Sequence, residues 1–315
     1  MNVIMTAPHL APAAVAVIEA AGGRLHYMAP FPSAAEVAAL AAKVQPVAIL
    51  SRQGPVTAAV MDAAPGLRVV ARHGVGVDDV DVAEAQRRGI VVTRAPGSNT
   101  QAVAEHTMAL LLALAKDLPL LSAQVAGGAW RKAETKVRDV AGLRLGLVGC
   151  GAIGRAVARL AAAFGMSVVA YDPTLPDGVG IESVASLHAL LRRSDVLSLH
   201  LPLLPVTRRL IGTAELAALP RGAVVLNTAR GGLIDEPALL QALEAGHLAG
   251  AGLDVFEDEP PPGDHLLRRH PRVICTPHVA GVTEGSLVNM GVMAAECIAA
   301  VLRGDPVLPE RLVRA

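Results

Sequence analysis

Three short segments place an arginine, acidic residues and a histidine directly after predicted strands of one sheet. Arg230 lies in NTARGG, Asp254 and Glu259 lie in DVFEDEPPP, and His278 lies in TPHVAG. Because the carboxyl ends of parallel strands meet at one edge of a sheet, we expect these side chains to converge there. Beside a nicotinamide, such a set suits hydride transfer to a 2-keto acid. The arginine grips the carboxylate and polarises the carbonyl, the histidine supplies a proton, and the carboxylate orients the imidazole.

Each of these residues also has a structural interpretation. Arg230 can brace a loop, Glu259 lies in an acidic surface run, and any of the ten histidines can be a structural hydrogen-bonding residue. Structural ion pairs gather the same residue types as active sites do. Only the joint location of the three residues favours chemistry.

The stretch around residue 150 has the pattern of a nucleotide-binding strand, turn and helix. An apolar run leads into Gly149, Gly151 and Gly154, spaced as GxGxxG, and an alanine-rich helical stretch follows. The first glycine permits a tight turn, the second lets the backbone approach a pyrophosphate, and the third lets the helix pack on the strand. A second apolar run ends at Asp172. Its carboxylate can accept hydrogen bonds from the ribose hydroxyls of the cofactor and would repel a 2′-phosphate. The unit predicts NAD as cofactor; the alternative is a glycine-rich turn without a ligand.

Other reactive residue types near these motifs have simpler interpretations. Cys150 lies inside the glycine motif, where a small residue fills a turn, and no base nearby in the sequence marks it as a nucleophile. Glu105 and His106 are adjacent rather than four residues apart on a helix face, so they predict a satisfied core pair and not a metal site. No metal is expected.

Short β-type runs alternate with helical runs through the first hundred residues, which predicts a parallel sheet with helices on both faces. Within it, the segment RHGVGVDDVD, residues 72–81, brings Gly74 and Gly76 to the end of a strand, before a helix capped by Asp79 or Asp81. A glycine loop in that place can expose backbone N–H groups to an anion. A plain turn is the simpler interpretation of the segment taken alone.

The second half of the chain repeats this alternation. A long apolar helix is expected from Asn99, as its cap, to about Asp117, and its apolar faces place it between domains or at a subunit interface. A connecting loop is expected at residues 127–138. Apolar runs then recur around and beyond the glycine motif and complete a second doubly wound sheet, so the fold class is α/β with two parallel-sheet domains. Residues 284–302 predict a helix, and the last dozen residues predict a surface tail.

Composition bounds the class of protein. The 315 residues suffice for two domains, and 28 Lys and Arg balance 28 Asp and Glu, without the basic footprint of a nucleic-acid or anionic-membrane binder. Three cysteines, an odd number, predict a reducing compartment, the cytoplasm. The N-terminus lacks a signal-peptide pattern, and Gly, Pro or a charge interrupts the apolar runs before membrane-spanning length, so no membrane partner is expected.

Long motifs over almost the whole chain resemble the D-isomer-specific 2-hydroxyacid dehydrogenases, which include phosphoglycerate dehydrogenases and glyoxylate or hydroxypyruvate reductases. The motifs are RHGVGVDDVD, APGSNTQAVAEHTMALLLALAK, GLVGCGAIG with YDP, HLPLLPVTRRLIG, GAVVLNTARGGLIDEPALLQALEAGHLAGAGLDVFEDEPP and TPHVAGVT. The resemblance implies an NAD-dependent oxidoreductase that interconverts a D-2-hydroxy acid and its 2-keto acid. It also implies a Rossmann NAD-binding domain, residues 99–280, inserted in a flavodoxin-like substrate domain, residues 1–98 plus 281–315.

The same resemblance implies roles for individual residues. Arg230, Glu259 and His278 are the implied catalytic residues, and the last two form the acid–base pair. The backbone around Val75 and Gly76 is implied to bind the substrate carboxylate, which replaces the plain-turn interpretation. The implied cofactor contacts are Gly149, Gly151, Ile153, Gly154, Asp172, Leu201, Pro202, Thr207, Thr228, Ala229, Arg230, Asp254 and Thr107.

The resemblance leaves the substrate open. Family members that act on formate carry glutamine where Glu259 stands, which argues against that chemistry. One alternative is a D-3-phosphoglycerate dehydrogenase without the C-terminal regulatory domain of the long family members. Arg52, with Arg131 or Lys132, would then neutralise a substrate phosphate, although Arg52 is equally interpreted as a solvated loop residue. A second alternative is an NAD-sensing, corepressor-like binding protein. Family members usually pair through the nucleotide domains and the helix after Asn99, so a homodimer is expected.

Overall fold

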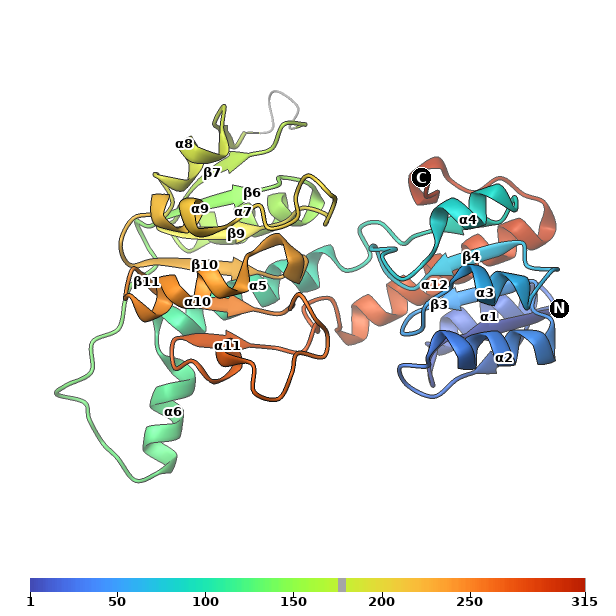
Figure 1. The fold of residues 1–315 in the computed structure, drawn as a ribbon, viewed down its shortest axis with the longest axis horizontal. Coiled ribbons are helices and arrows are strands. Elements are labelled where there is room, and N and C mark those ends of the chain that lie inside the picture. Colours follow the sequence, from blue (N-terminus) through green and yellow to red (C-terminus); the bar gives the residue numbers. More distant parts are fainter. Residues whose placement is uncertain (175–179, 315) are drawn as a thin grey trace. The chain divides into compact units, whose positions relative to one another are not determined.

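The computed structural model describes residues 1–174 and 180–314, and their contacts separate the chain into two compact units (Figure 1). Unit 1 comprises Met1–Asn99 with Val282–Ala315, and unit 2 comprises Thr100–Gly281. Each unit is a parallel sheet with helices on both faces, which confirms the predicted fold class.

Unit 1 has five parallel strands in the order β2-β1-β3-β4-β5. This doubly wound order has its switch point between β1 and β3, where the loops after neighbouring strands diverge and ligands collect. Its strands are β1 (Asn2–Met5), β2 (Arg24–Tyr27), β3 (Ala48–Ser51), β4 (Val69–Arg72) and β5 (Val91–Thr93), and its helices are α1 (Pro12–Ala20), α2 (Ala34–Val44), α3 (Ala58–Asp62), α4 (Val82–Arg87) and α12 (Glu284–Arg303).

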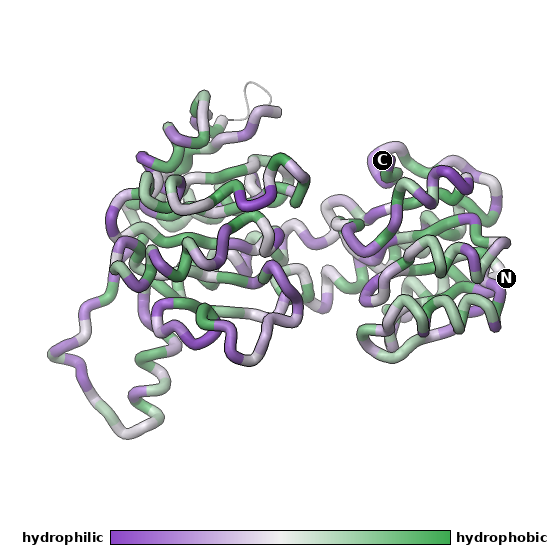
Figure 2. The backbone as a smooth tube through the Cα atoms, viewed as in Figure 1, coloured by the Kyte–Doolittle hydropathy of each residue, from purple (hydrophilic) through white to green (hydrophobic). Residues whose placement is uncertain are grey.

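Both faces of this sheet are buried. In β1, Ile4 packs with residues of α2, α3 and α4, whereas Val3 and Met5 pack with α1 and α12. Successive strand residues point to opposite faces, so burial of both faces favours apolar residues at most positions. Hydrophobic stretches of backbone, green in Figure 2, accordingly occur in both units.

Helix α12 has the length and apolar composition of a membrane-spanning helix, contrary to the expectation that every apolar run is too short. Taken together, the bent pair of α5 (Thr100–Ala115) and α6 (Leu118–Ala126) is also long and apolar enough to span a membrane. Ala294, Ala295 and Ile298 of α12 are buried in one cluster with α1 and strands β1, β3 and β4. Packing inside unit 1 therefore accounts for the apolar face of α12.

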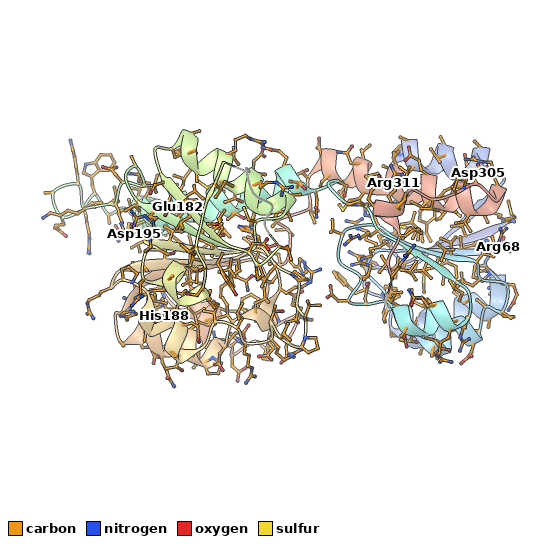
Figure 3. All side chains as sticks on the ribbon, turned by 90° about the horizontal axis from the view of Figure 1, so that it is seen from above. Arg68, Glu182, His188, Asp195, Asp305 and Arg311 are labelled. Carbon is orange, nitrogen blue, oxygen red and sulfur yellow. The ribbon has the colours of Figure 1, made fainter. Side chains whose placement is uncertain are left out.

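The last residues of the chain do not form a free surface tail. Val313 N donates to Val92 O over 2.9 Å, and Arg94 N donates to Arg311 O over 2.8 Å. The Arg311 side chain, labelled in Figure 3, pairs with Glu296 of α12 at 2.7 Å. The prediction was wrong because β5 is an edge strand, and the returning chain pairs with its open backbone groups.

Unit 2 has seven parallel strands in the order β12-β11-β10-β9-β6-β7-β8, with a switch point between β6 and β9. Besides α5 and α6, it contains β6 (Arg144–Val148), α7 (Ala152–Ala163), β7 (Ser167–Tyr171), β8 (Glu182–Ser183), α8 (Leu187–Leu191), β9 (Val196–Leu199), α9 (Thr213–Ala218), β10 (Ala223–Asn227), α10 (Glu236–Glu244), β11 (Leu248–Leu253), α11 (Leu266–Arg269) and β12 (Val273–Cys275).

The long helix expected from Asn99 to Asp117 is shorter, and Asn99 is not its cap. It begins at Thr100 as α5, and Asn99 Oδ1 is buried without a hydrogen-bond partner among the described residues, so Asn99 does not cap it. Helix α6 follows and was not predicted. Within α6, all of which is described, no residue is buried, and Trp130 in the following loop is 79% exposed. This segment therefore presents apolar side chains outside the core of unit 2.

His200, which follows β9, supports the turn after β6. It is partly buried, its Nε2 lies 2.8 Å from Ser198 Oγ, and its backbone N–H donates to Val148 O over 2.8 Å. A Cβ at Gly149, where φ is +88°, would lie 2.5 Å from His200 O, so only glycine allows this approach. Burial lowers the pKa of His200 to about 4.

We expect His200 to make the free energy of unfolding depend on pH. The unfolded imidazole titrates near its ordinary pKa of about 6.5, whereas the folded one resists protonation until about pH 4. The stabilisation is therefore complete above pH 6.5 and declines as the pH falls toward 4. The decline reaches roughly 2 kcal/mol at pH 5 from this residue alone.

Urea unfolding at pH 7.5 and pH 5 measures this effect in wild type and in His200→Gln. The variant should lose less stability on acidification than wild type. His188→Gln, at an exposed position labelled in Figure 3, is the matched control and should behave as wild type. Equal losses in wild type and His200→Gln would contradict the account.

Candidate active site

The strands β6, β10, β11 and β12 of unit 2 run parallel and end at one edge of its sheet. Gly149 follows β6, Arg230 follows β10, Asp254 and Glu259 follow β11, and His278 follows β12. The strands are linked through the crossover helices seen in Figure 1, so segments far apart in the sequence share this edge. The candidate site is built here.

Glu259 and His278 form a close pair. His278 Nδ1 lies 2.6 Å from Glu259 Oε2, and the His278 and Glu259 side chains are 51% and 36% exposed. No hydrogen bond to Nε2 of His278 occurs within the described part of the chain, so this nitrogen is left for a ligand. Phe256 N donates to Glu259 Oε1 over 3.0 Å and fixes the carboxylate on its other side.

The environment keeps Glu259 ionised. Partial burial alone would raise its pKa, but the hydrogen bond and charge of His278, the Phe256 N–H and the charge of Arg230 outweigh that effect. The pKa of Glu259 is therefore lowered overall. A carboxylate that stays charged can hold an imidazole in one orientation and stabilise its protonated form.

Asp254 lies beneath the turn that carries His278. The Asp254 side chain is 1% exposed. Its carboxylate accepts hydrogen bonds from Thr276 Oγ1 over 2.5 Å, from Val279 N over 2.9 Å and from Ala280 N over 2.8 Å. His278 has a left-handed φ of 55°, a conformation that persists only where neighbouring bonds hold it. Both carboxylate oxygens bond to protein groups, so Asp254 holds this turn. Its contact with a cofactor stays a prediction.

His106 of α5 contacts the same turn, and neither motif nor spacing revealed it. Its Nε2 lies 2.9 Å from Thr276 Oγ1 and 3.7 Å from Asp254 Oδ1. Glu105 is exposed and accepts a hydrogen bond from Gln101 Nε2 over 2.7 Å. The predicted Glu105–His106 core pair is wrong, because adjacent helix residues point about 100° apart. The partner of His106 lies 170 residues away in the sequence, so local spacing carries no signal for it.

The loop that carries Arg230 is fixed by two contacts. Asn227, which is 1% exposed and was not predicted, donates through Nδ2 to Arg230 O over 2.8 Å. A Cβ at Gly231 would lie 1.8 Å from the backbone carbon of Phe256, so only glycine lets this loop touch the loop that leads to Glu259. The two loops are therefore held in register, and Arg230 lies close enough to act on the pKa of Glu259.

The glycine turn after β6 has room for a pyrophosphate. A Cβ at Gly154 would lie 2.5 Å from Gly149 O, which shows how closely α7 approaches the end of β6. Gly151 is the N-cap of α7, and within the described residues a Cβ there would meet no atom within 4 Å. Backbone N–H groups at an open helix N-terminus are a ready site for an anion. This cradle fits the predicted cofactor NAD.

Asp172 follows β7 beside this turn. One oxygen of its carboxylate accepts a hydrogen bond from Cys150 N over 2.8 Å. The other oxygen accepts hydrogen bonds from Thr174 N over 2.9 Å and from Thr174 Oγ1 over 2.8 Å. Burial would raise the pKa of Asp172, but these hydrogen bonds and the charge of Arg155 lower it overall. Cys150 itself is buried, and burial raises the pKa of its thiol, so it has no reactive thiolate near neutral pH.

The other predicted cofactor residues lie in helices α5 and α7 and in the loops that follow β9 and β10. Thr107 of α5 and Thr228 lie with their hydroxyl oxygens 2.9 Å apart, and both are buried. Thr207 donates to Pro202 O over 2.8 Å and accepts Leu204 N over 2.7 Å, so it shapes the loop after β9. The partly buried positions are Ile153, Leu201 and Ala229.

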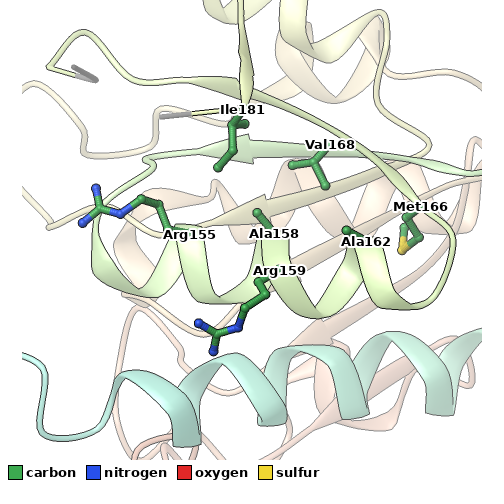
Figure 4. Close-up of a pocket in the computed structure, with 8 residues that line it drawn as sticks. Arg155, Ala158, Arg159, Ala162, Met166, Val168 and Ile181 are labelled. Atoms are coloured by element: carbon green, nitrogen blue, oxygen red, sulfur yellow. The ribbon is translucent and has the colours of Figure 1, made fainter. Parts of the chain in front are cut away.

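A cavity of about 380 Å³ lies along α7 (Figure 4). Arg155 and Arg159 border it, and Met166 and Val168 line it. It lies against the flank of α7 and not at the strand ends that carry the catalytic candidates. Its relevance is that Arg155, which borders it, also acts on Asp172.

The predicted substrate residues Arg52, Val75 and Gly76 lie in unit 1. Arg52 follows β3, and Val75 and Gly76 follow β4, so they share the carboxyl edge of that sheet. Burial and the neighbouring Arg72 lower the pKa of Arg52, whose guanidinium has no partner among the described residues. Arg131 and Lys132 are exposed in the loop that enters β6 at its amino end, the opposite edge from the catalytic candidates.

Residues 108–280, more than half of the chain, match the family model described as the D-isomer specific 2-hydroxyacid dehydrogenase, NAD binding domain. The D-3-phosphoglycerate dehydrogenase of Methanocaldococcus jannaschii is 42% identical over 254 residues, which cover 79% of this chain and 48% of that relative. The chain thus spans about half the length of this relative.

Two further relatives match over most of their length. The glyoxylate reductase of Korarchaeum cryptofilum is 42% identical over 267 residues, which cover 82% of this chain and 80% of that relative. The crystal structure of the TT0316 protein from Thermus thermophilus covers 100% of both chains with a TM-score of 0.92 at 40% identity. Together with the glycine turn and the strand-end site, these matches show that the chain belongs to the D-isomer-specific 2-hydroxyacid dehydrogenase family.

Proposed function

We propose that this protein is an NAD-dependent oxidoreductase that interconverts a D-2-hydroxy acid and its 2-keto acid. The observation that carries the proposal is the Glu259–His278 pair, 2.6 Å apart, beside Arg230 at the strand-end edge of the NAD-binding domain. Family membership supports the same reaction class.

The glycine turn and Asp172 would hold the cofactor. Gly151, at the N-cap of α7, leaves the backbone open to the pyrophosphate, and Asp172 offers an ionised carboxylate to the ribose hydroxyls. When bound, NAD accepts the hydride in oxidation and NADH donates it in reduction. The chain's own residues bind the acid and move the proton.

His278 and Arg230 would act directly on the substrate. In reduction, His278 donates a proton from Nε2 to the carbonyl oxygen of the keto acid, and in oxidation it removes that proton. Glu259 stabilises the imidazolium through Nδ1. Arg230 binds the substrate carboxylate and polarises the carbonyl, which a planar guanidinium suits well.

Residues of unit 1 would also bind the substrate. The half-buried guanidinium of Arg52 has no partner in the part of the chain that the structure describes, and burying a charge unpaired is costly. Since an anionic ligand would satisfy it, Arg52 is proposed to bind a substrate anion. The N–H groups around Val75 and Gly76 would bind the substrate carboxylate. This assignment makes unit 1 the substrate domain.

The proposal has two forms, which differ in whether the substrate is a small unphosphorylated acid or a phosphorylated one. The matched relatives include a glyoxylate reductase and a D-3-phosphoglycerate dehydrogenase, and Arg52 suits either a carboxylate or a phosphate. NADH oxidation followed by absorbance, with glyoxylate, hydroxypyruvate, phosphohydroxypyruvate, pyruvate and a branched 2-keto acid, distinguishes them. Preference for the phosphorylated acid would assign the phosphoglycerate reaction, and turnover of none would contradict both forms.

We also propose a cytoplasmic homodimer. Cys150, Cys275 and Cys297 are free thiols, which fits a reducing compartment. Helix α6 and the following loop expose Leu120, Val125 and other apolar side chains that a second subunit would cover. Light scattering on the intact protein measures this mass, and a monomeric mass would contradict the dimer.

Substituting His278 tests its role in proton transfer. His278→Ala should lower turnover roughly 10²- to 10⁴-fold, the span of a lost general acid. The affinity for NADH should stay unchanged, because the glycine turn is intact. His188→Ala, at an exposed position in the same domain, is the matched control. Near-normal turnover of the folded His278 variant would remove His278 from the mechanism.

Substituting Asp172 tests cofactor choice. Asp172→Ala should raise the use of NADPH relative to NADH by roughly tenfold or more, since a repulsive charge is lost while the Arg155 cation remains. The double variant Asp172→Ala/Arg155→Ala should lose part of that gain. Steady-state kinetics with both cofactors measure the ratio. A wild type that already prefers NADPH would contradict the charge argument.

A further inference from the structure

Arg72, the last residue of β4, joins the two loops of unit 1 to which the proposed function assigns substrate binding. Its Nη1 donates to Arg52 O over 2.9 Å, in the loop after β3. Its Nε donates to Gly76 O over 2.8 Å, in the glycine loop after β4. One planar guanidinium thus bonds to a backbone carbonyl of each loop.

Asp79 and Ser51 hold this guanidinium in place. Arg72 Nη1 lies 2.6 Å from Asp79 Oδ2 and 3.3 Å from Ser51 Oγ, and Ser51 Oγ in turn lies 3.4 Å from Asp79 Oδ2. The Arg72 and Asp79 side chains are only 20% and 27% exposed, so solvent screens the pair weakly. The backbone of Asp79 is itself tied down, because Val56 N donates to Asp79 O over 2.8 Å.

The two arginines at this edge have different surroundings. The charge of Arg72 is balanced by Asp79 and its donors are used on carbonyls, whereas no partner for the Arg52 guanidinium occurs within the described chain. Arg72 also contributes to the lowered pKa of Arg52, so the two cations are near neighbours. Repulsion between them would spread the loops if Asp79 did not balance one of the charges.

We infer that Arg72 is a positioning residue, which fixes the Arg52 loop and the Val75–Gly76 loop relative to each other so that both meet one substrate anion. The inference rests on the proposed function for the role of these loops. A ligand held by two loops is bound well only if both are already in place, because ordering a loop on binding opposes affinity. Loss of the bridge should therefore weaken substrate binding without touching the NAD-binding residues of unit 2.

The test uses the intact protein and a variant that removes both charges. Arg72→Met alone leaves Asp79 half-buried without its cation, whereas Arg72→Met/Asp79→Asn removes the whole pair and spares the fold. For the double variant we expect the KM for the keto acid that wild type reduces to rise roughly 10- to 100-fold. The Kd of NADH and the melting temperature should stay near their wild-type values.

Three controls separate positioning from a general defect. Arg68→Met makes the same change just before β4, where Arg68 bonds to Val301 O, and should leave KM unchanged (Figure 3). Arg72→Lys should recover only part of the affinity, because an ammonium restores the charge and not the fork of donors. In the double variant, amide hydrogen exchange should speed up in residues 73–79 and not in β1.

The outcomes are distinct. An unchanged KM in the folded double variant would overturn the inference, and so would a raised KM with unchanged exchange in residues 73–79, since Arg72 would then be a direct ligand. If wild type reduces none of the keto acids, the proposed function fails. In that case amide hydrogen exchange alone tests the inference. Faster exchange in residues 73–79 of the double variant supports the Arg72 bridge, and unchanged exchange overturns it.

Discussion

Parallel strand pairing is the constraint on which the site of unit 2 depends. It brings the ends of β6, β10, β11 and β12 to one edge, so that loops more than a hundred residues apart in the sequence become neighbours. Two of the contacts between these loops and their neighbours are closer than a side chain allows, and each is made by a glycine. Gly149 touches the His200 carbonyl and Gly231 touches the Phe256 backbone. The fold therefore determines the distance between Arg230, Glu259 and His278 before any ligand binds.

Two carboxylates that follow β11 serve the same histidine in different ways. Asp254 is buried, and both of its carboxylate oxygens accept hydrogen bonds from the turn that holds His278 in a left-handed conformation. Glu259 is half-exposed, stays ionised and bonds to the imidazole itself. Support and chemistry are thus divided between a buried and an accessible acid. Unit 1 shows a similar division between Arg72, whose donors bond to carbonyls, and Arg52, whose guanidinium has no partner among the described residues.

The sequence predicted those features whose signal is local. The GxGxxG turn, the buried strands and the strand-end segments carry their own patterns, because most residues of a doubly covered strand are apolar and a tight backbone contact requires glycine. Features that depend on distant partners were missed. His106 reaches Thr276 across 170 residues, and the C-terminal residues pair with β5, which lies far earlier in the sequence. Helix α6 has no buried face, so no periodic pattern marked it.

The central claim is that hydride passes directly between the nicotinamide and C2 of a 2-hydroxy acid. It is tested most directly with NADH that carries deuterium in the hydrogen transferred from C4. This cofactor is incubated with whichever keto acid other than glyoxylate is turned over fastest, since the glycolate formed from glyoxylate has no D or L form. The account predicts a product with one deuterium at C2 and the D configuration, seen by mass spectrometry and chiral chromatography. A product that contains no deuterium at C2, or one of the L configuration, would contradict it.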